Sequence, residues 1–310
     1  MTFHPDMIRN AVEAISQSEN EEMSDIIIGD NSSGKSFLLK SLLVQLKEKK
    51  HIYFIDAVNR GFDVSKVISE QKRETSERPV LEKRLLDINF NIKDTFSCYG
   101  TDTERVEEIY RLYEDKVQDL FKKLTGDRFT IAASAAYGEV LLNGEAATLS
   151  SGYQAMVRMI LELLFYTEKH GDHAWVVIDE IDEFLSPGYA SKILSFFREN
   201  FPGIHFVVTT HSADLVVTSE NARVITLKKD QYDVLDVDDL DTYRKIQRLF
   251  NGVFGVEEPV LEDTDMILRR LLNRKINDAW TDADEEILKE LHQKKLSASQ
   301  RMICKQIEEW

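Results

Sequence analysis

Four short motifs contain the residue types that could do chemistry, and they follow one another in a fixed order. The first runs from Gly29 through Gly34, Lys35 and Ser36 and has the pattern Gly-x4-Gly-Lys-Ser. Glycines in such a loop let backbone N–H groups turn towards phosphate oxygens, at the positive end of the next helix. The ammonium of Lys35 would reach the terminal phosphates, and the hydroxyl of Ser36 would bind Mg²⁺. The pattern predicts a nucleotide-binding loop.

The residues between the two glycines, with Asn31 and Ser33 among them, are predicted to belong to the same phosphate-binding loop. The apolar run at residues 26–28 predicts a buried strand before the loop, and residues 37–46 have helical spacing after it. An ordinary glycine- and serine-rich turn is the alternative interpretation. The flanking strand and helix favour the nucleotide site, because this motif requires that context.

A pair of carboxylates, Asp179 and Glu180, ends an apolar run that begins at Trp175. A strand this apolar is buried, so its last residues lie at the sheet edge where ligands bind in α/β proteins. Asp179 is suited to the outer shell of Mg²⁺, and Glu180 to polarising an attacking water. Many strands end in acidic caps, so the pair gains its meaning from the phosphate loop earlier in the chain.

The two remaining motifs are a histidine after a strand and a serine–glycine motif at a helix start. His211 follows the apolar run 205–208, and its distance from Glu180 favours a sensor of the γ-phosphate over a simple strand-end cap. The sequence Leu-Ser-Ser-Gly at residues 149–152 opens a predicted helix. On its own it is an ordinary helix cap; a hydroxyl at a helix N-terminus also favours negative charge.

Together the four motifs resemble the ABC-type ATPase family, in its RecF/SMC-like branch, over roughly residues 24–228. In that family the signature serine and glycine contact the γ-phosphate bound to the opposite subunit, and by position these are Ser150 and Gly152. The resemblance implies ATP and Mg²⁺ as cofactors, and a homodimer or higher homo-oligomer clamped by ATP. The chain departs from the family at Ser32, where glycine is usual, and at Tyr153, where glutamine or glutamate is common.

Residues 181–187 and the helical tail near Val253 resemble the small stand-alone ATPases of bacterial anti-phage defence operons, of the Septu PtuA type. Ser186 stands where those proteins often have a histidine. The resemblance implies a cytoplasmic ATPase that regulates a separately encoded effector such as a nuclease. Slow turnover of ATP is compatible with such a role. A RecF-like DNA repair ATPase is the alternative, followed by the ATP-binding subunit of a transporter. The acidic residues Glu262, Asp263 and Asp265 are read as a helix start and not as a nuclease site.

Composition narrows the class of protein further. The net charge of −16 argues against a broad nucleic-acid surface, so nucleic acid stays an open partner that the charge does not indicate. No apolar run approaches the ~20 residues of a membrane helix, and no secretory signal follows Met1, so no membrane association is expected. Cys98 and Cys304 are far apart, which favours two reduced thiols in the cytoplasm.

The alternation of apolar runs and helical stretches predicts an α/β fold, an ABC-ATPase-type P-loop NTPase with a mainly parallel sheet. A helical insertion and a C-terminal helical appendage complete the prediction. The predicted parts are 1–58 with the phosphate loop, 59–128 as a helical arm, 129–237 with the signature, acidic strand and histidine, and 238–310 as the tail. The residue of the family's glutamine loop stays open between Asn59 and Gln71.

Overall fold

The computed structural model divides the chain into two compact units, Met1–Phe254 and Gly255–Trp310. The structure describes residues 4–17, 23–47, 51–67, 85–94, 96, 105–132, 139–170, 174–228, 231–240, 243–254, 267–268, 271–272, 274–275, 280–292 and 296–309. Gln71, Cys98 and the acidic residues at 262–265 therefore lie outside the described residues.

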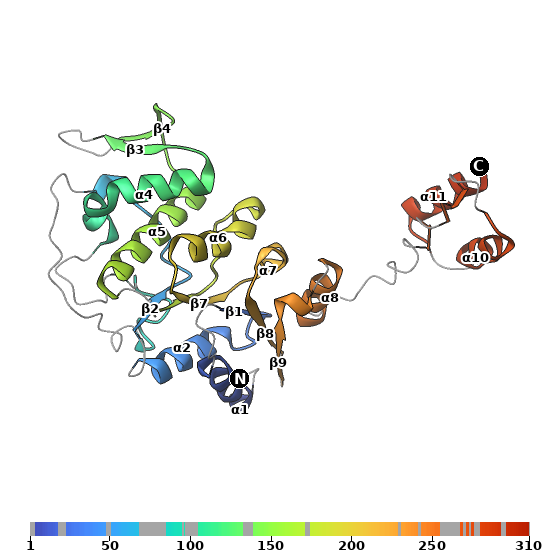
Figure 1. The fold of residues 1–310 in the computed structure, drawn as a ribbon, viewed down its shortest axis with the longest axis horizontal. Helices are drawn as coiled ribbons and strands as arrows, with labels where there is room; N and C mark the ends of the chain where they lie inside the picture. Colours follow the sequence, from blue (N-terminus) through green and yellow to red (C-terminus); the bar gives the residue numbers. More distant parts are fainter. Residues whose placement is uncertain are drawn as a thin grey trace. The chain divides into compact units, whose positions relative to one another are not determined.

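A six-stranded sheet forms the centre of the larger unit, with the strand order β2-β6-β7-β1-β8-β9 (Figure 1). The strands are β1 (Ser24–Gly29), β2 (Ile52–Ile55), β6 (Trp175–Ile178), β7 (His205–Thr209), β8 (Ala222–Leu227) and β9 (Tyr232–Asp236). All neighbours in the described part pair in parallel except β8 and β9. The predicted α/β fold with a mainly parallel sheet is confirmed. The carboxyl ends of β1, β6 and β7 consequently meet at one edge.

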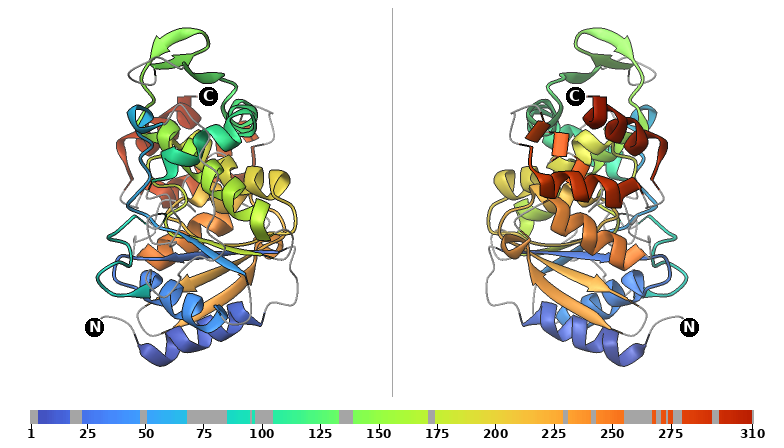
Figure 2. Two further views of the ribbon diagram at one scale, coloured as in Figure 1. Left: turned by 90° about the vertical axis from the view of Figure 1, so that its left-hand side faces the viewer. Right: turned by 90° about the vertical axis from the view of Figure 1, so that its right-hand side faces the viewer.

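Helices cover both faces of this sheet (Figures 1 and 2). On one face lie α1 (Pro5–Ser16) and α2 (Lys35–Leu46); on the other lie α4 (Tyr110–Thr125), α5 (Ser151–His170) and α6 (Pro187–Asn200). Alternate strand residues enter the two cores: Ile27 packs with α1 and α2, whereas Ile26 and Ile28 pack with the opposite layer. Strands buried on both faces must be apolar throughout, which explains the continuous apolar runs in the sequence.

A second, three-stranded sheet in the order β3-β4-β5 lies beyond α4 (Figure 1). Its strands are β3 (Phe129–Ala132), β4 (Glu139–Leu142) and β5 (Glu145–Ala147), all antiparallel. Asn143 and Gly144 join β4 to β5 with φ angles of 53° and 90°. Two successive positive φ angles at Asn-Gly are typical of a type I′ hairpin turn. This turn joins β4 and β5 into a tight antiparallel hairpin.

The shorter elements of the larger unit connect the strands to the helical layers. They are the 3₁₀ turns η1 (Val64–Lys66), η3 (Val106–Ile109) and η4 (Val237–Asp239), and the helices α7 (Ala213–Thr218) and α8 (Tyr243–Phe254). Helix α8 belongs to the larger unit, although the sequence grouped it with the tail. Between residues 59 and 105 the described segments are mostly loops and turns, with the 3₁₀ turn η1, a helical residue at Leu85 and a 3₁₀ residue at Phe96. The predicted four-part division stays a prediction.

The smaller unit has a hydrophobic core of its own. It contains α10 (Asp282–His292) and α11 (Ala298–Glu309), and its buried residues are Leu268, Leu271, Leu288, Leu291, Cys304 and Ile307. A capping box precedes α11, because the Gln300 N–H donates to Ser297 Oγ at 3.2 Å and the Ser297 N–H donates to Gln300 Oε1 at 2.9 Å. Cys304 is a free, buried thiol.

A buried ionic cluster lies near the amino end of β1, opposite the phosphate loop. Asp25 is fully buried; its Oδ2 lies 2.9 Å from His205 Nε2, and its Oδ1 accepts a hydrogen bond from Arg223 Nε at 2.8 Å. The ring of His205 stacks on Trp175 with centroids 4.0 Å apart. A buried carboxylate is tolerated only because these partners satisfy it. The cluster therefore joins β1, β7 and β8 at this end of the sheet.

We expect Asp25→Ala to lower the free energy of unfolding by about 3–5 kcal/mol, because it leaves the partners of a buried ion pair uncompensated. Urea unfolding followed by circular dichroism measures the change. The matched control is Asp87→Ala, since the Asp87 side chain is 95% exposed and pairs only with Lys40 among the described residues. That change should cost no more than about 1 kcal/mol. Equal unfolding midpoints for the two variants would contradict the assignment.

Candidate nucleotide-binding site

The phosphate loop joins the end of β1 to the start of α2 through two residues in left-handed conformations. Gly34 has φ 103° and Ser32 has φ 66°. Glycine adopts this region freely, whereas a serine there is disfavoured by about 1–2 kcal/mol. The structure thus gives the physical reason why the family has glycine at the position of Ser32. Gly29 is required for another reason, since a Cβ on it would lie 2.4 Å from Ser33 Oγ.

Lys35 is the cation of this loop, and its ammonium lies inside it. Lys35 Nζ donates hydrogen bonds to the carbonyl oxygens of Gly29, at 2.7 Å, and Asp30, at 3.3 Å. Burial lowers the pKa of the ammonium, and the charges of Glu180 and Asp179 oppose that shift. Lys35 and the carboxylates of Asp179 and Glu180 therefore lie in one site. The sequence predicted this arrangement at the strand ends.

Asp179 is the buried carboxylate of the acidic pair, with 3% of its surface exposed. Its Oδ1 accepts a hydrogen bond from Thr209 Oγ1 at 2.6 Å, and its Oδ2 accepts one from Asn91 Nδ2 at 2.6 Å. Burial raises the pKa of Asp179, and these two hydrogen bonds act in the opposite direction. The sequence reasoning missed Asn91, which lies in a turn without a motif; nothing in the sequence could have indicated it.

Glu180 follows β6 in a left-handed conformation, with φ 52°. Its carboxylate Oε1 lies 3.7 Å from His211 Nε2, longer than a hydrogen bond, and about a third of each side chain is exposed. The neighbouring imidazole of His211 lowers the pKa of Glu180, so the carboxylate stays ionised. The ring of Phe254, the last residue of α8, lies 5.5 Å from the His211 ring. The predicted catalytic pair is thus brought together beside Lys35.

The signature motif opens α5 with side chains that face solvent. Ser150 is exposed, and its hydroxyl accepts a hydrogen bond from the Tyr153 N–H at 3.3 Å, which caps the helix. A Cβ on Gly152 would lie 2.8 Å from the carbonyl oxygen of Phe184, in the loop after the acidic pair. This close approach of the helix start to the Phe184 backbone explains why residue 152 is a glycine. A contact of Ser150 and Gly152 with a phosphate of the opposite subunit stays a prediction.

Tyr153, the residue after the signature, points into the helical layer. Its hydroxyl donates to Asp127 and lies 3.3 Å from the hydroxyl of Tyr189. The departure from the family at this position therefore has a structural role, linking α5 to α6 and to the segment before β3.

The glutamine loop of the family has no confirmed equivalent among the described residues. Asn59 Nδ2 donates to Asp56 Oδ1 at 3.1 Å, so this amide bonds to its own loop and not to the acidic pair. The amide in contact with Asp179 belongs to Asn91. The choice between Asn59 and Gln71 stays open.

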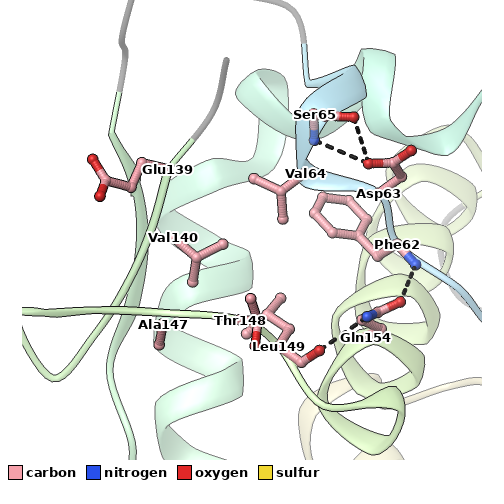
Figure 3. Close-up of a pocket in the computed structure, with 10 residues that line it drawn as sticks. All are labelled: Phe62, Asp63, Val64, Ser65, Glu139, Val140, Ala147, Thr148, Leu149 and Gln154. Atoms are coloured by element: carbon pink, nitrogen blue, oxygen red, sulfur yellow. Dashed lines mark hydrogen bonds between the residues drawn. The ribbon is translucent and has the colours of Figure 1, made fainter.

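A pocket of about 640 Å³ lies beside the signature loop (Figure 3). Gln154 links two of its walls: Nε2 donates to the Leu149 carbonyl at 2.9 Å, and Oε1 accepts from the Phe62 N–H at 3.3 Å. The other wall comes from β4 and β5, and the full lining is Phe62, Asp63, Val64, Ser65, Glu139, Val140, Ala147, Thr148, Leu149 and Gln154. The loop after β2 and the signature loop are thus tied by one side chain.

The oxygen atoms at the loop fit Mg²⁺ bound together with a nucleotide. Ser36 offers an exposed hydroxyl in the first turn of α2, and the Asp179 carboxylate keeps lone pairs beyond its two hydrogen bonds. In the described part of the chain, no group of three or more acidic, histidine or cysteine side chains could form a metal cage. Mg²⁺ typically takes one or two protein ligands and completes its shell with phosphate and water.

A family model described as "AAA domain, putative AbiEii toxin, Type IV TA system" matches residues 140–218. The match runs from β4 to the end of α7 and includes the signature motif, the acidic pair and His211. The phosphate loop lies before it. The matched family therefore covers the part of the chain that would supply the catalytic pair.

Two Septu PtuA proteins are similar to the chain. PtuA of Bacillus thuringiensis is 27% identical over 157 residues, which cover 46% of this chain and 36% of that protein. PtuA of Bacillus mycoides (strain KBAB4) is 22% identical over 243 residues, covering 60% of this chain and 34% of that protein. The chain resembles an ABC-type ATPase of the RecF/SMC-like branch. It spans about a third of the length of the curated relatives it matches.

Among solved structures, cbiO1 of Clostridium perfringens, part of the ABC transporter complex cbiONQ, is similar with a TM-score of 0.39. It is 16% identical, and the alignment covers 74% of this chain and 83% of that chain. In this chain, none of the helices that the structure describes combines the length and apolar character needed to cross a membrane.

We expect Lys35→Ala to weaken ATP binding by about 100-fold or more, because loss of a partly buried charged contact typically costs 2–5 kcal/mol. Calorimetric titration with Mg-ATP measures the affinity. Lys40→Ala is the matched control, since Lys40 lies on the same helix and pairs with the exposed Asp87. Its affinity should equal that of the wild type. Unchanged binding by Lys35→Ala would contradict the assignment of the loop.

Proposed function

We propose that the chain binds ATP with Mg²⁺, hydrolyses it, and forms an ATP-clamped dimer that regulates a partner effector. The observation that supports this best is the convergence of Lys35, Asp179, Glu180 and His211 at the carboxyl ends of three neighbouring strands. A cation, a buried carboxylate and an ionised carboxylate beside an imidazole are the groups that phosphoryl transfer to water requires.

Each residue has a distinct task in the proposed reaction. The backbone at Gly29, Asn31, Ser33 and Gly34 cradles the phosphates, and Lys35 leaves the loop carbonyls to bind the terminal phosphate oxygens. Glu180 orients the attacking water and accepts its proton, and its lowered pKa keeps it in the basic form. His211 lies beside Glu180 and contacts the γ-phosphate. Ser36 and Asp179 would hold Mg²⁺, which would supply positive charge to stabilise the developing charge of the phosphates.

The dimer is proposed from the exposure of the signature and from the resemblance. Ser150 and Ser151 face solvent at the N-terminus of α5, where a second copy can reach them. A helix N-terminus with a serine hydroxyl favours a phosphate, so the γ-phosphate of one protomer would contact Ser150 and Gly152 of the other. Two equivalent sites then follow from two-fold symmetry.

The effector and the biological setting are proposed from the similarity to Septu PtuA proteins. The resemblance to stand-alone ATPases of anti-phage defence operons supports a cytoplasmic role in bacterial defence. In such a role the dimer would control a separately encoded protein, such as a nuclease. The net charge of −16 makes a protein partner a better match for most of the surface than nucleic acid.

Glu180→Gln tests the composite site. The variant keeps the shape of the side chain but removes the base, so hydrolysis should fall by about 100-fold or more while ATP stays bound. Size-exclusion chromatography with Mg-ATP should then give a stable dimer, and chelation of Mg²⁺ should return it to monomer.

The matched control is Glu183→Gln, the same change at an exposed glutamate three positions later. It should hydrolyse ATP at the wild-type rate and form no trapped dimer. If Glu180→Gln elutes only as a monomer with Mg-ATP, the composite-site proposal is wrong. If it hydrolyses ATP as fast as the wild type, Glu180 is not the base.

A further inference from the structure

The peptide group between Asp179 and Glu180 is held at both ends by side chains from elsewhere in the chain. Its carbonyl oxygen accepts a hydrogen bond from Arg60 Nη2 at 2.8 Å. Its N–H donates to Thr209 Oγ1 at 2.6 Å. Glu180 follows this peptide with φ 52°, a conformation that is disfavoured for a glutamate. Such a conformation persists only where the surroundings fix it, and here two hydrogen bonds do so.

An arginine is an unusual donor for a buried backbone carbonyl oxygen. Arg60 is 2% exposed, and its Nε and Nη1 atoms are buried without a hydrogen-bond partner among the described residues. Burial of a guanidinium with incomplete hydrogen bonding is unfavourable, and an apolar residue of similar size often stabilises a fold better. Fold stability alone therefore does not account for an arginine at this position.

The loop that carries Arg60 is shaped so that the side chain reaches the acidic pair. Asp56, at the end of β2, accepts hydrogen bonds from the N–H groups of Val58, at 3.0 Å, and Asn59, at 2.7 Å. This Asx-type turn brings Arg60 next to the end of β6, because β6 pairs directly with β2.

The charge of Arg60 also belongs to the site. Burial lowers the pKa of its guanidinium, whereas the carboxylates of Asp56, Glu162 and Asp179 raise it. In return, the positive charge is one of the influences that lower the pKa of Glu180. The guanidinium, 2.8 Å from the Asp179 carbonyl oxygen, thus lies close enough to the acidic pair to offset part of its negative charge.

We propose that Arg60 is a positioning residue for ATP hydrolysis, which holds the Asp179 carbonyl and so keeps Glu180 in its left-handed conformation, aimed at the attacking water. The proposal rests on the proposed ATPase function and adds to it a residue outside every motif. Arg60 acts through Glu180 and does not touch the nucleotide. Its loss should therefore affect the rate of the chemical step and leave ATP binding by the phosphate loop intact.

The test compares Arg60→Met and Arg60→Lys in the full chain. Methionine fills similar space without a donor, whereas lysine keeps the charge and one donor for the carbonyl. We expect Arg60→Met to lower kcat by about 100-fold, the typical effect of a catalytic group displaced by about 1 Å. The dissociation constant for a non-hydrolysable ATP analogue should change less than threefold. Arg60→Lys should restore kcat to at least tenfold above the methionine variant.

The control for a purely structural loss is Arg223→Met, which breaks a buried ion pair with Asp25 near the amino ends of the strands. It should lower the midpoint of urea unfolding but keep kcat at the wild-type value. Binding stoichiometry of the ATP analogue reports the folded fraction of every variant, so kcat is expressed per competent site. A variant that is less stable but keeps Glu180 in position would behave like this control.

Three results would overturn the role of Arg60: a wild-type kcat for Arg60→Met, an equal loss of kcat and analogue affinity, or no gain from lysine over methionine. Each of these leaves the ATPase proposal standing as long as the wild type hydrolyses ATP and Glu180→Gln does not. A wild-type chain that binds Mg-ATP without turnover would overturn both proposals together.

Discussion

The parallel pairing of β6 with β7, and of β7 with β1, is the constraint on which the site depends. Parallel strands end at one edge, so residues that follow Gly29, Ile178 and Thr209 are adjacent in space. Thr209 makes this adjacency rigid, because its hydroxyl accepts from the Glu180 N–H and donates to the Asp179 carboxylate. The core residues on both faces hold in place the strands whose ends carry the proposed site.

The motifs were predictable because their signals are local. Lys35, Asp179, Glu180 and His211 each follow an apolar strand. Arg60 and Asn91 were not predictable, since they contact Asp179 across 119 and 88 residues and lie in loops without a periodic pattern. Contacts of that separation depend on loop conformation, which neither residue type nor spacing encodes.

Ser150 and Gly152 of the signature have structural roles in addition to the proposed role in phosphate binding. Ser150 caps α5, and Gly152 permits the helix to approach the carbonyl of Phe184. The approach links the start of α5 to the loop that follows Glu180. Gln154 adds a second link, from the same turn of α5 to the loop of Arg60. The signature and the loop after the acidic pair are therefore in direct contact within one protomer.

The site also extends to a part of the chain that the sequence assigned to the tail. Helix α8 packs in the larger unit through the buried residues Ile246, Phe250 and Val253, and its last ring, Phe254, lies against His211. The His211 imidazole therefore has the Phe254 ring 5.5 Å from its centre and the Glu180 carboxylate 3.7 Å from its Nε2. Helix α8, which contributes no motif, thus restricts movement of the His211 side chain through Phe254. Because the larger unit ends at Phe254, the proposed γ-phosphate sensor is packed by the final residue of the unit that carries the proposed site.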